Sequence, residues 1–251
     1  MTNSLYTSIL QSNQSNKKKF AVLIDPDNTD RISLDQLIEL TVKQDVDYFF
    51  VGGSLIVRDN LDDCLNTIKK DCNIPVILFP GSSYQINDKA DAIFFLSLIS
   101  GRNPELLIGQ QVAAAPLLKK SSLEVIPTGY MIIDGQAPTT VSYISNTNPI
   151  PTDKTDIAVC TAMAGEMLGL KMIYMDAGSG AKKPISEEMI REVRNNISIP
   201  MVVGGGIASS EKAYLNCKAG ADIIVIGNAI EKDPTLIGEI SEAIHSVETI
   251  Q

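Results

Sequence analysis

Short apolar runs alternate along this chain with longer stretches in which apolar residues recur at helical spacing. The runs are rich in Val, Ile and Phe, and they are continuous rather than interrupted by polar residues. This is typical of parallel strands that are covered on both faces. We therefore predict eight strands, at residues 20–25, 47–52, 75–79, 91–96, 124–133, 172–176, 200–204 and 222–227.

The stretches between these runs have the periodicity of amphipathic helices. They predict helices at residues 34–43, 61–70, 104–118, 156–168, 187–195, 211–217 and 234–247. Ser33 and Ser186 each stand shortly before one of these helices and are predicted N-caps. Strand and helix alternate from end to end, which predicts one α/β domain over residues 1–251, a (β/α)8 TIM barrel.

Two segments depart from the alternation. Only residues 80–90 separate the third and fourth strands, too few for an ordinary helix and its two loops, so that helix is predicted to be absent or reduced. Residues 135–155, after the fifth strand, are rich in Thr, Ser, Asn and Pro. A long polar loop at the carboxyl end of a barrel strand is either a substrate wall or lid, or a surface excursion.

The overall charge limits the classes of partner. The chain of 251 residues has a formal net charge of -9, which argues against nucleic acid or a strongly anionic membrane surface as the main partner. The lysines at 17–19 are interpreted as a solvated approach to the first strand. The four cysteines lack C-x-x-C spacing, so we expect reduced thiols in a cytoplasmic protein. No stretch is long and apolar enough to span a bilayer.

Glycines follow the sixth, seventh and eighth predicted strands, in the segments 178–180, 204–206 and 227–228. At the carboxyl ends of consecutive barrel strands, glycines let backbone N–H groups approach an anion closely, and the next helix N-terminus adds its dipole. Phosphate binding by the loops after strands 7 and 8 is a recurring use of this barrel. We therefore predict a phosphorylated small molecule as ligand.

The first two strands end in oxygen ligands. Asp25 closes the first strand and Ser54 follows the second, so both are predicted at the same mouth as the glycines. A carboxylate and a hydroxyl suit Mg²⁺ that keeps several waters and shares substrate phosphates. The structural alternative is that Asp25 and Pro26 simply open a turn.

The remaining candidate chemistry lies at the end of the sixth strand. His245, the single histidine, falls in the last predicted helix, and Lys171 precedes its strand, so a histidine base or a Schiff-base lysine is disfavoured. Tyr174 and Asp176 stand two apart and face the same side of the strand, where they can bind the hydroxyls of a polyol phosphate. Alternatively, Tyr174 fills a barrel layer and Asp176 caps the turn.

A set of motifs now points to a family. They are Leu-Ile-Asp-Pro-Asp at 23–27, Val-Gly-Gly-Ser at 51–54, Phe-Pro-Gly at 79–81, Ile-Pro-Thr-Gly-Tyr at 126–130, Tyr-Met-Asp-Ala-Gly-Ser-Gly-Ala at 174–181, Val-Gly-Gly-Gly-Ile at 203–207 and Ile-Gly-Asn-Ala at 226–229. In order and spacing, the chain resembles the geranylgeranylglyceryl phosphate synthase family, in its group II-like form. The resemblance covers essentially the whole chain.

The resemblance implies a Mg²⁺-dependent prenyltransferase. It joins sn-glycerol 1-phosphate to a polyprenyl diphosphate, geranylgeranyl diphosphate, and forms an ether bond with release of diphosphate. Asp25 and Ser54 then bind the metal, and Asp176, with Tyr174, is the catalytic pair that orients the acceptor hydroxyl or takes its proton. Some family members carry Glu in place of Asp176. The residues implied to hold glycerol 1-phosphate are Tyr174, Met175, Asp176, Ala177, Gly178, Ser179, Gly180, Gly205, Gly206, Gly227 and Asn228.

The family's modified barrel also implies an apolar groove for the prenyl chain. Candidate lining residues are Phe94, Phe95, Leu96, Leu98, Ile99 and the segment 112–118, with Tyr130 closing the groove; alternatively these residues are packing core. We further expect a homo-oligomer, a dimer or a hexamer, and transient contact with the bilayer. The competing functions are a sugar-phosphate isomerase, a transferase like thiamine-phosphate synthase, and a non-catalytic barrel that binds a phosphate ligand.

Overall fold

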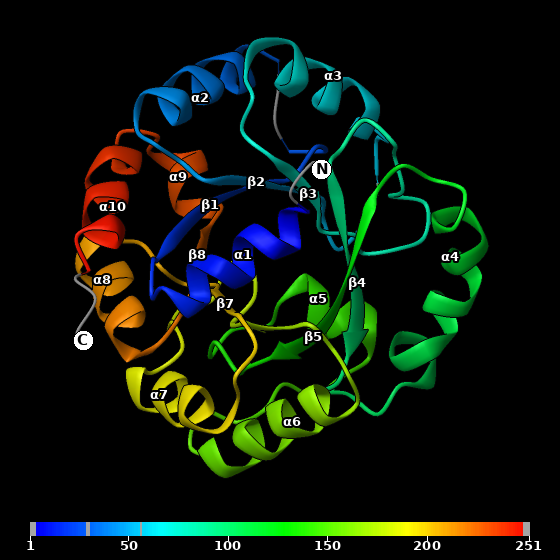
Figure 1. The fold of residues 1–251 in the computed structure, drawn as a ribbon, viewed down its shortest axis with the longest axis vertical. Helices are drawn as coiled ribbons and strands as arrows, with labels where there is room; N and C mark the ends of the chain where they lie inside the picture. Colours follow the sequence, from blue (N-terminus) through cyan, green and yellow to red (C-terminus); the bar gives the residue numbers. More distant parts are fainter. Residues whose placement is uncertain (1–3, 29–30, 56, 248–251) are drawn as a thin grey trace.

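The computed structural model describes residues 4–28, 31–55 and 57–247. In these residues, eight parallel strands close into one barrel in the order β1 to β8 (Figure 1). The strands are β1 Lys19–Ile24, β2 Tyr48–Val51, β3 Val76–Leu78, β4 Ala92–Leu98, β5 Glu124–Ile132, β6 Met172–Asp176, β7 Met201–Gly204 and β8 Ile223–Ile226. All eight predicted strands are present, and the barrel confirms the predicted fold class.

Most of the helices form a ring outside the barrel, whereas α1 crosses its centre in this view (Figure 1). Those that correspond to predicted helices are α2 Arg31–Lys43, α3 Leu61–Asp71, α4 Gln110–Leu118 with the preceding π-helical turn Glu105–Gly109, α6 Thr155–Met167, α7 Glu187–Asn196, α8 Ser210–Ala219 and α10 Leu236–His245. Three further helices were not predicted: α1 Leu5–Gln14, α5 Thr140–Ser145 and α9 Asn228–Lys232. Residues 79–91, between β3 and β4, are all described and contain no helix, as predicted.

Successive residues of each strand face opposite sides of the barrel wall. In β2, Tyr48 and Phe50 belong to a buried cluster inside the barrel, whereas Phe49 and Val51 belong to the cluster between the barrel and the helices. The interior cluster is aromatic at its centre, where the ring of Phe50 meets the edge of Phe94 at 4.8 Å. Both faces of the strands are therefore apolar, which explains the continuous apolar runs.

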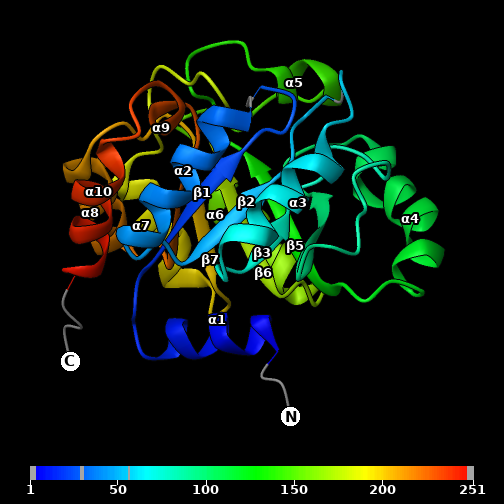
Figure 2. The ribbon, with the colours of Figure 1, turned by 90° about the horizontal axis from the view of Figure 1, so that it is seen from above.

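Helix α1 lies across the amino-terminal end of the barrel (Figure 2). The backbone N–H groups of Leu5 and Tyr6 donate to the carboxylate of Glu124 at 2.6 and 3.1 Å, and Ile9 is buried in the interior cluster. A carboxylate at a helix N-terminus satisfies N–H groups that have no partner within the helix and complements its dipole. Because Glu124 begins β5, this contact fixes α1 over the end of the barrel opposite the carboxyl ends of the strands.

The lysine run was interpreted wrongly as a solvated approach. Lys18 is only 6 % exposed, and its Nζ lies 3.4 Å from Oδ1 of Asp222. Arg194 pairs with the same carboxylate at 2.9 Å, and Lys19 pairs with Asp47 at 2.7 Å. Because β1 begins at this point, two of the three lysines are drawn into ion pairs at the amino-terminal end of the barrel.

The two predicted helix caps had different outcomes. Ser186 caps α7, since its side chain accepts a hydrogen bond from the N–H of Met189 at 3.2 Å. The prediction for Ser33 was wrong, because α2 begins at Arg31 and Ser33 lies within the helix.

Among the described residues, no helix is long and apolar enough to cross a membrane.

Candidate active site

The carboxyl ends of the strands bring nearly all predicted site residues to one mouth of the barrel. Asp25 follows β1, Ser54 follows β2, Asp176 ends β6, and the predicted glycines follow β6, β7 and β8. The short helices α5 and α9 lie at this end, opposite α1 (Figure 2). Met175 and Ala177 differ from the others, because their side chains are buried in the outer cluster. His245 is exposed and pairs with Asp47, at the start of β2 and away from this mouth.

Asp176 is the buried charge of the mouth. The hydroxyl of Tyr130 donates to its Oδ2 at 2.5 Å, and the N–H of Gly178 donates to its Oδ1 at 2.7 Å. Burial raises the pKa of Asp176 above the usual value, and these two hydrogen bonds, which favour the ionised form, counteract part of that effect. Burial and the nearby carboxylate raise the pKa of Tyr130 well above the usual value, so this phenol remains protonated and able to donate.

Tyr174 fills the uppermost layer of the barrel interior. Its ring stacks on Phe79 with centroids 5.0 Å apart and meets Tyr130 edge-on at 5.5 Å. Its hydroxyl lies close to Gly204, because a Cβ at that glycine would come within 3.2 Å of the oxygen. Burial, followed by the charge of Asp176, raises the pKa of Tyr174 well above 10. The residue therefore packs as a barrel layer and also presents a neutral phenol near the mouth.

The glycine loops after β6 and β7 pack backbone against backbone. Gly205 has a φ of +83°, and a Cβ there would lie 2.7 Å from the N atoms of Ala177 and Gly178 and 2.8 Å from Oδ1 of Asp176. Only glycine combines this conformation with such a close approach. The loop after β6 also reaches α9, since the hydroxyl of Ser179 donates to Oδ1 of Asn228 at 3.0 Å. The three glycine-rich loops thus form one continuous rim.

The ends of β1 to β3 make the opposite part of the mouth. Asp25 accepts hydrogen bonds from the N–H of Asp27 at 3.1 Å and from the side chain of Asn28 at 2.7 Å. A Cβ at Gly53 would lie 3.0 Å from Oδ1 of Asp25, so the carboxylate lies directly against the end of β2, beside Ser54. Burial, with a smaller contribution from Asp27, raises the pKa of Asp25.

Glu231, on α9, is a member of this region that the sequence interpretation missed. Its pKa is raised, first by burial and then by repulsion from Asp25. The charge of Asp25 therefore reaches Glu231 across the junction of β8 and β1. The sequence could have indicated Glu231, because it stands shortly after Gly227, the glycine that follows the eighth strand.

The carboxylate of Asp25 and the neighbouring hydroxyl of Ser54 suit a metal ion that is also bound by an anionic substrate. Among the described residues, no group of three or more His, Cys, Asp or Glu side chains is placed to hold an ion. One carboxylate with a neighbouring hydroxyl is too small a set for a closed protein site. It is the donor set expected for Mg²⁺ that keeps waters and shares phosphate oxygens.

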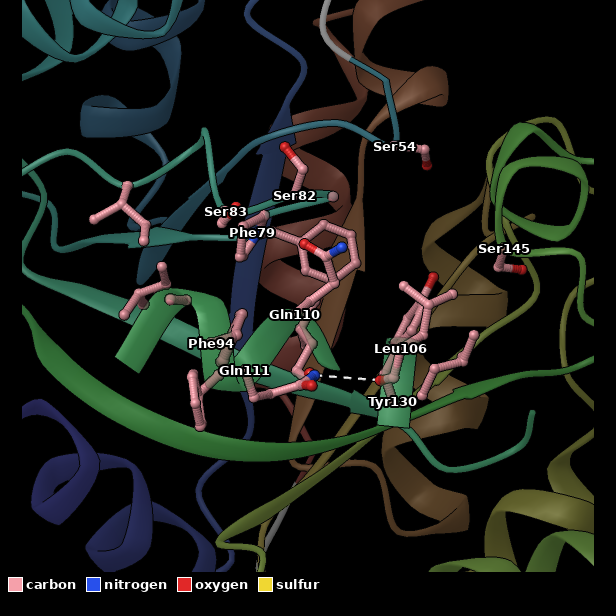
Figure 3. Close-up of a pocket in the computed structure, with 18 of the residues that line it drawn as sticks. Ser54, Phe79, Ser82, Ser83, Phe94, Leu106, Gln110, Gln111, Tyr130 and Ser145 are labelled. Atoms are coloured by element: carbon pink, nitrogen blue, oxygen red, sulfur yellow. Dashed lines mark hydrogen bonds between the residues drawn. The ribbon is translucent and has the colours of Figure 1, made fainter. Parts of the chain in front are cut away.

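An apolar groove opens beside this corner (Figure 3). Ser54 and Gly81 line the groove near the mouth of the barrel. The walls of the groove are formed by the segment 79–86, β4, α4 and α5. The predicted residues Phe94, Phe95, Leu96, Leu98 and Tyr130 line it, together with Phe79, Leu106, Gln111 and Ile144. Part of the 135–155 loop, as α5, therefore forms a groove wall.

The groove prediction was wrong in two details. Ile99 packs with the outer cluster instead of lining the groove. Of the segment 112–118, only Ala114 and Leu118 line it, because the rest of the helix faces outward. Gln111 holds the helix in place: its amide nitrogen donates to the carbonyl oxygens of Leu106, at 3.2 Å, and Leu96 (Figure 3).

Comparison with known proteins agrees with this arrangement. The PcrB family profile matches residues 13–246. The geranylgeranylglyceryl phosphate synthase of Chitinophaga pinensis is 59% identical over 98% of this chain and 98% of its own length. The protein of the same name from Pyrococcus horikoshii is 43% identical over 88% of this chain and 86% of its own.

Solved structures show the same likeness. The crystal structure of (S)-3-O-geranylgeranylglyceryl phosphate synthase from Thermoplasma acidophilum, in complex with its substrate sn-glycerol-1-phosphate, has a TM-score of 0.92 and 34% identity. The alignment covers 97% of this chain and 99% of that one. Thiamine phosphate pyrophosphorylase from Pyrococcus furiosus, at 14% identity and a TM-score of 0.58, shares the fold alone.

Proposed function

This chain belongs to the PcrB family and is a prenyltransferase that forms geranylgeranylglyceryl phosphate, and from that premise we propose how its mouth performs the transfer. Glycerol 1-phosphate binds at the glycine rim, and geranylgeranyl diphosphate lies in the groove with its diphosphate at Asp25 and Ser54. The observation that carries this proposal is the position of Tyr130. Its ring lines the groove, and its hydroxyl is bonded to Asp176 at the rim, so the two substrates meet there.

The phosphate of the acceptor is assigned to the rim. We assign it to the backbone N–H groups of residues 179–180, 205–206 and 227–228, in the loops after β6, β7 and β8, where Gly180, Gly205 and Gly206 have positive φ. Backbone donors and the start of α9 supply the positive potential that a phosphate dianion needs. This use of the backbone explains how Met175 and Ala177 belong to the segment although their side chains point outward.

The diphosphate end of the donor is assigned to the opposite corner. Asp25 and Ser54 would hold Mg²⁺ through one carboxylate and one hydroxyl, a donor set that suits an ion shared with a diphosphate. When bound, the metal neutralises the charge that develops on the leaving diphosphate. Asp25 is held for this role by the N–H of Asp27 and the side chain of Asn28.

Transfer then depends on position more than on a strong base. The C1–O bond to diphosphate breaks, the C3 hydroxyl oxygen of the acceptor bonds to C1, and its proton passes to Asp176. Because an allylic C1 becomes strongly electrophilic as diphosphate leaves, a carboxylate suffices as acceptor. Tyr130 and Gly178 hold that carboxylate in one orientation, and Tyr174 closes the floor of the mouth beneath it.

Two broader features belong to the same proposal. The protein works in the cytoplasm, where the reduced thiols expected for its cysteines would be maintained. It also forms a homo-oligomer, a dimer or a hexamer. Exposed apolar side chains on α6 and at its C-cap, namely Ile157, Met167 and Leu168, support self-association. Light scattering of the purified chain checks this point.

The direct test is a prenyl-transfer assay with geranylgeranyl diphosphate, Mg²⁺ and each enantiomer of glycerol phosphate. We expect ether product from sn-glycerol 1-phosphate only, and no product in EDTA. A second assay with Asp25→Ala is expected to need much more Mg²⁺. Equal rates with both enantiomers, or an undiminished rate in EDTA, would contradict the assignments of rim and metal.

A further inference from the structure

Helix α4 and the π-helical turn Glu105–Gly109 before it carry exposed apolar residues on the side that faces away from the barrel. Ile108, Val112 and Leu117 are each more than half exposed, and Ala113 and Ala115 between them are exposed as well. We call these five residues the outer face of α4. An amphipathic surface helix normally turns polar residues to solvent, so an apolar outer face indicates a further partner.

The inner side of the same helix lines the groove. Gln111, Ala114 and Leu118 face the groove, and the amide of Gln111 ties the helix to β4. One layer of helix therefore separates the prenyl-binding groove from the outer face. Figure 1 places α4 at the outer edge of the ring, on the side away from α10 and the C-terminal end.

The charges around the outer face differ between its two ends, because Glu105, which is exposed and has its carboxylate beside Gly109, precedes it, and lysines follow it. No Asp or Glu occurs from residue 106 to residue 123, although the chain as a whole has a net charge of -9. Lys119 and Lys120 follow the helix and are exposed. An apolar helix face with lysines at its end is complementary to a lipid surface, since the side chains enter the acyl boundary and the ammonium groups reach the headgroups.

Exposed aromatic residues adjoin the groove on its other walls. Tyr84 follows the lining residue Ser83, and Tyr143 precedes the lining residue Ile144; both tyrosines are largely exposed. Tyrosine combines an apolar ring with a polar hydroxyl, which suits the boundary between acyl chains and headgroups.

We infer that the outer face of α4 docks on a lipid bilayer, so that the prenyl chain passes between the membrane and the groove. The inference rests on the proposed function, because it takes the groove as the prenyl site. A second copy of this chain would also cover an apolar face. The lysines at the end of the helix and the groove directly behind it favour lipid instead.

The chain contains no tryptophan, so one introduced indole reports on its own surroundings. The test uses Val112→Trp with vesicles of phosphatidylcholine and phosphatidylglycerol, and Val42→Trp, on α2, as the matched control. Docking predicts a blue shift of emission on adding vesicles for the first variant alone. No shift for Val112→Trp, or the same shift for both, would overturn the inference.

A second pair of variants measures binding. We expect Val112→Glu/Leu117→Glu to lower the vesicle partition coefficient at least about tenfold, and Val42→Glu/Leu215→Glu, which adds the same charge elsewhere, to leave it unchanged. The Val112→Glu/Leu117→Glu variant should still convert geranyl diphosphate in solution. It should lose activity toward geranylgeranyl diphosphate that is supplied in vesicles. Unchanged vesicle binding together with a changed mass in light scattering would assign the face to a second copy and overturn the inference.

The two proposals fail separately. Absence of ether product from the unmodified chain with soluble geranyl diphosphate would contradict the proposed function. Sedimentation with vesicles needs no catalysis and decides the docking in either case.

Discussion

The hydroxyl of Tyr130 and the carboxylate of Asp176 are joined by a hydrogen bond of 2.5 Å between β5 and the end of β6. The bond connects a residue of the apolar groove to the charged residue of the glycine rim. It favours the ionised carboxylate in a place where burial opposes ionisation. In the proposed reaction, the orientation and the protonation of the proton acceptor therefore depend on a groove residue.

Replacing Tyr130 by Phe removes this donor and should raise the pKa of Asp176 further. Because the ionised form is the active one, the rise of kcat/KM with pH is expected to move to higher pH, and the rate at neutral pH to fall by about tenfold. The measurement is a pH–rate profile with soluble geranyl diphosphate. Tyr6→Phe, a change of the same kind at the opposite end of the barrel, should leave the profile in place.

Asp176→Asn should separate activity from stability. The amide keeps an acceptor for Gly178 but takes no proton, so activity should fall by about 10²–10⁴-fold. The raised pKa means that the folded chain holds this proton more tightly than the unfolded chain. Stability is therefore lost as pH rises from the usual carboxyl pKa through the raised one.

Asparagine has no such penalty. The variant should unfold at an equal or higher denaturant concentration at neutral pH, and its advantage should shrink as the pH is lowered through the raised pKa. Urea unfolding at several pH values tests this. A variant that is less stable than the unmodified chain at neutral pH, with the gap constant in pH, would show that the buried charge is not costly.

Gly205 and Gly180 offer a matched pair of backbone positions. Both have positive φ, +83° and +80°, but a Cβ at Gly205 meets three backbone or side-chain atoms within 2.8 Å, whereas a Cβ at Gly180 meets nothing within 4 Å. Gly205→Ala should cost about 2–5 kcal/mol and abolish binding of glycerol 1-phosphate. Gly180→Ala should cost about 1–2 kcal/mol. Calorimetric titration and urea unfolding compare the two, and equal effects would contradict the close packing of the rim.

In the proposed function Asp25 is a ligand of Mg²⁺, so the dependence of the rate on Mg²⁺ should follow the protonation of this carboxylate. Its raised pKa means that acidification neutralises this ligand at a higher pH than for an ordinary aspartate, so Mg²⁺ affinity should weaken from that pH downward. Asp25→Asn should raise the Mg²⁺ concentration for half-maximal rate at least about tenfold and remove this pH dependence. Asp62→Asn, a surface carboxylate paired with Lys89, is the control and should change neither.

Lys17 and Lys18 are neighbours with different surroundings. Lys18 is buried beside Asp222, whereas Lys17 is exposed. Lys18→Met should lower the free energy of unfolding by about 1–3 kcal/mol, limited by the remaining pair between Arg194 and Asp222. Lys17→Met should stay within about 0.5 kcal/mol of the unmodified chain. Similar losses for both would show that Lys18 contributes no more than a surface charge.

The strands were predictable because both of their faces are buried, which leaves an apolar run in the sequence. Helix α1 was not, since its apolar residues are confined to Leu5, Tyr6, Ile9 and Leu10 and the segment is otherwise rich in Ser, Asn and Gln. Its start is stabilised by Glu124, from the distant strand β5. The difference between the groove-facing side of α4 and its outer face could not be predicted either. Apolar residues occur all round this helix, so their spacing does not mark one side as buried.

The site residues likewise divide into those that the sequence could predict and those that it could not. Glycines and carboxylates at strand ends were predictable, because parallel strands deliver their carboxyl ends to one mouth. The partner of Asp176 was not, since Tyr130 belongs to another strand and reaches Asp176 only through the parallel register of β5 and β6, which pairs it directly with Tyr174. The proximity of Glu231 to Asp25 likewise depends on closure of the barrel, which places β8 beside β1.

That closure pairs Lys19 with Ile223, so the first strand finds its second neighbour only in the last. During synthesis on the ribosome, β1 emerges early and keeps one open edge until β8 has left the exit tunnel. An open edge of Phe, Val and Ile is a template for pairing with other chains. The emerging chain is therefore exposed to aggregation until β8, close to the end of the sequence, appears, and a chain released before that point would keep the open edge permanently.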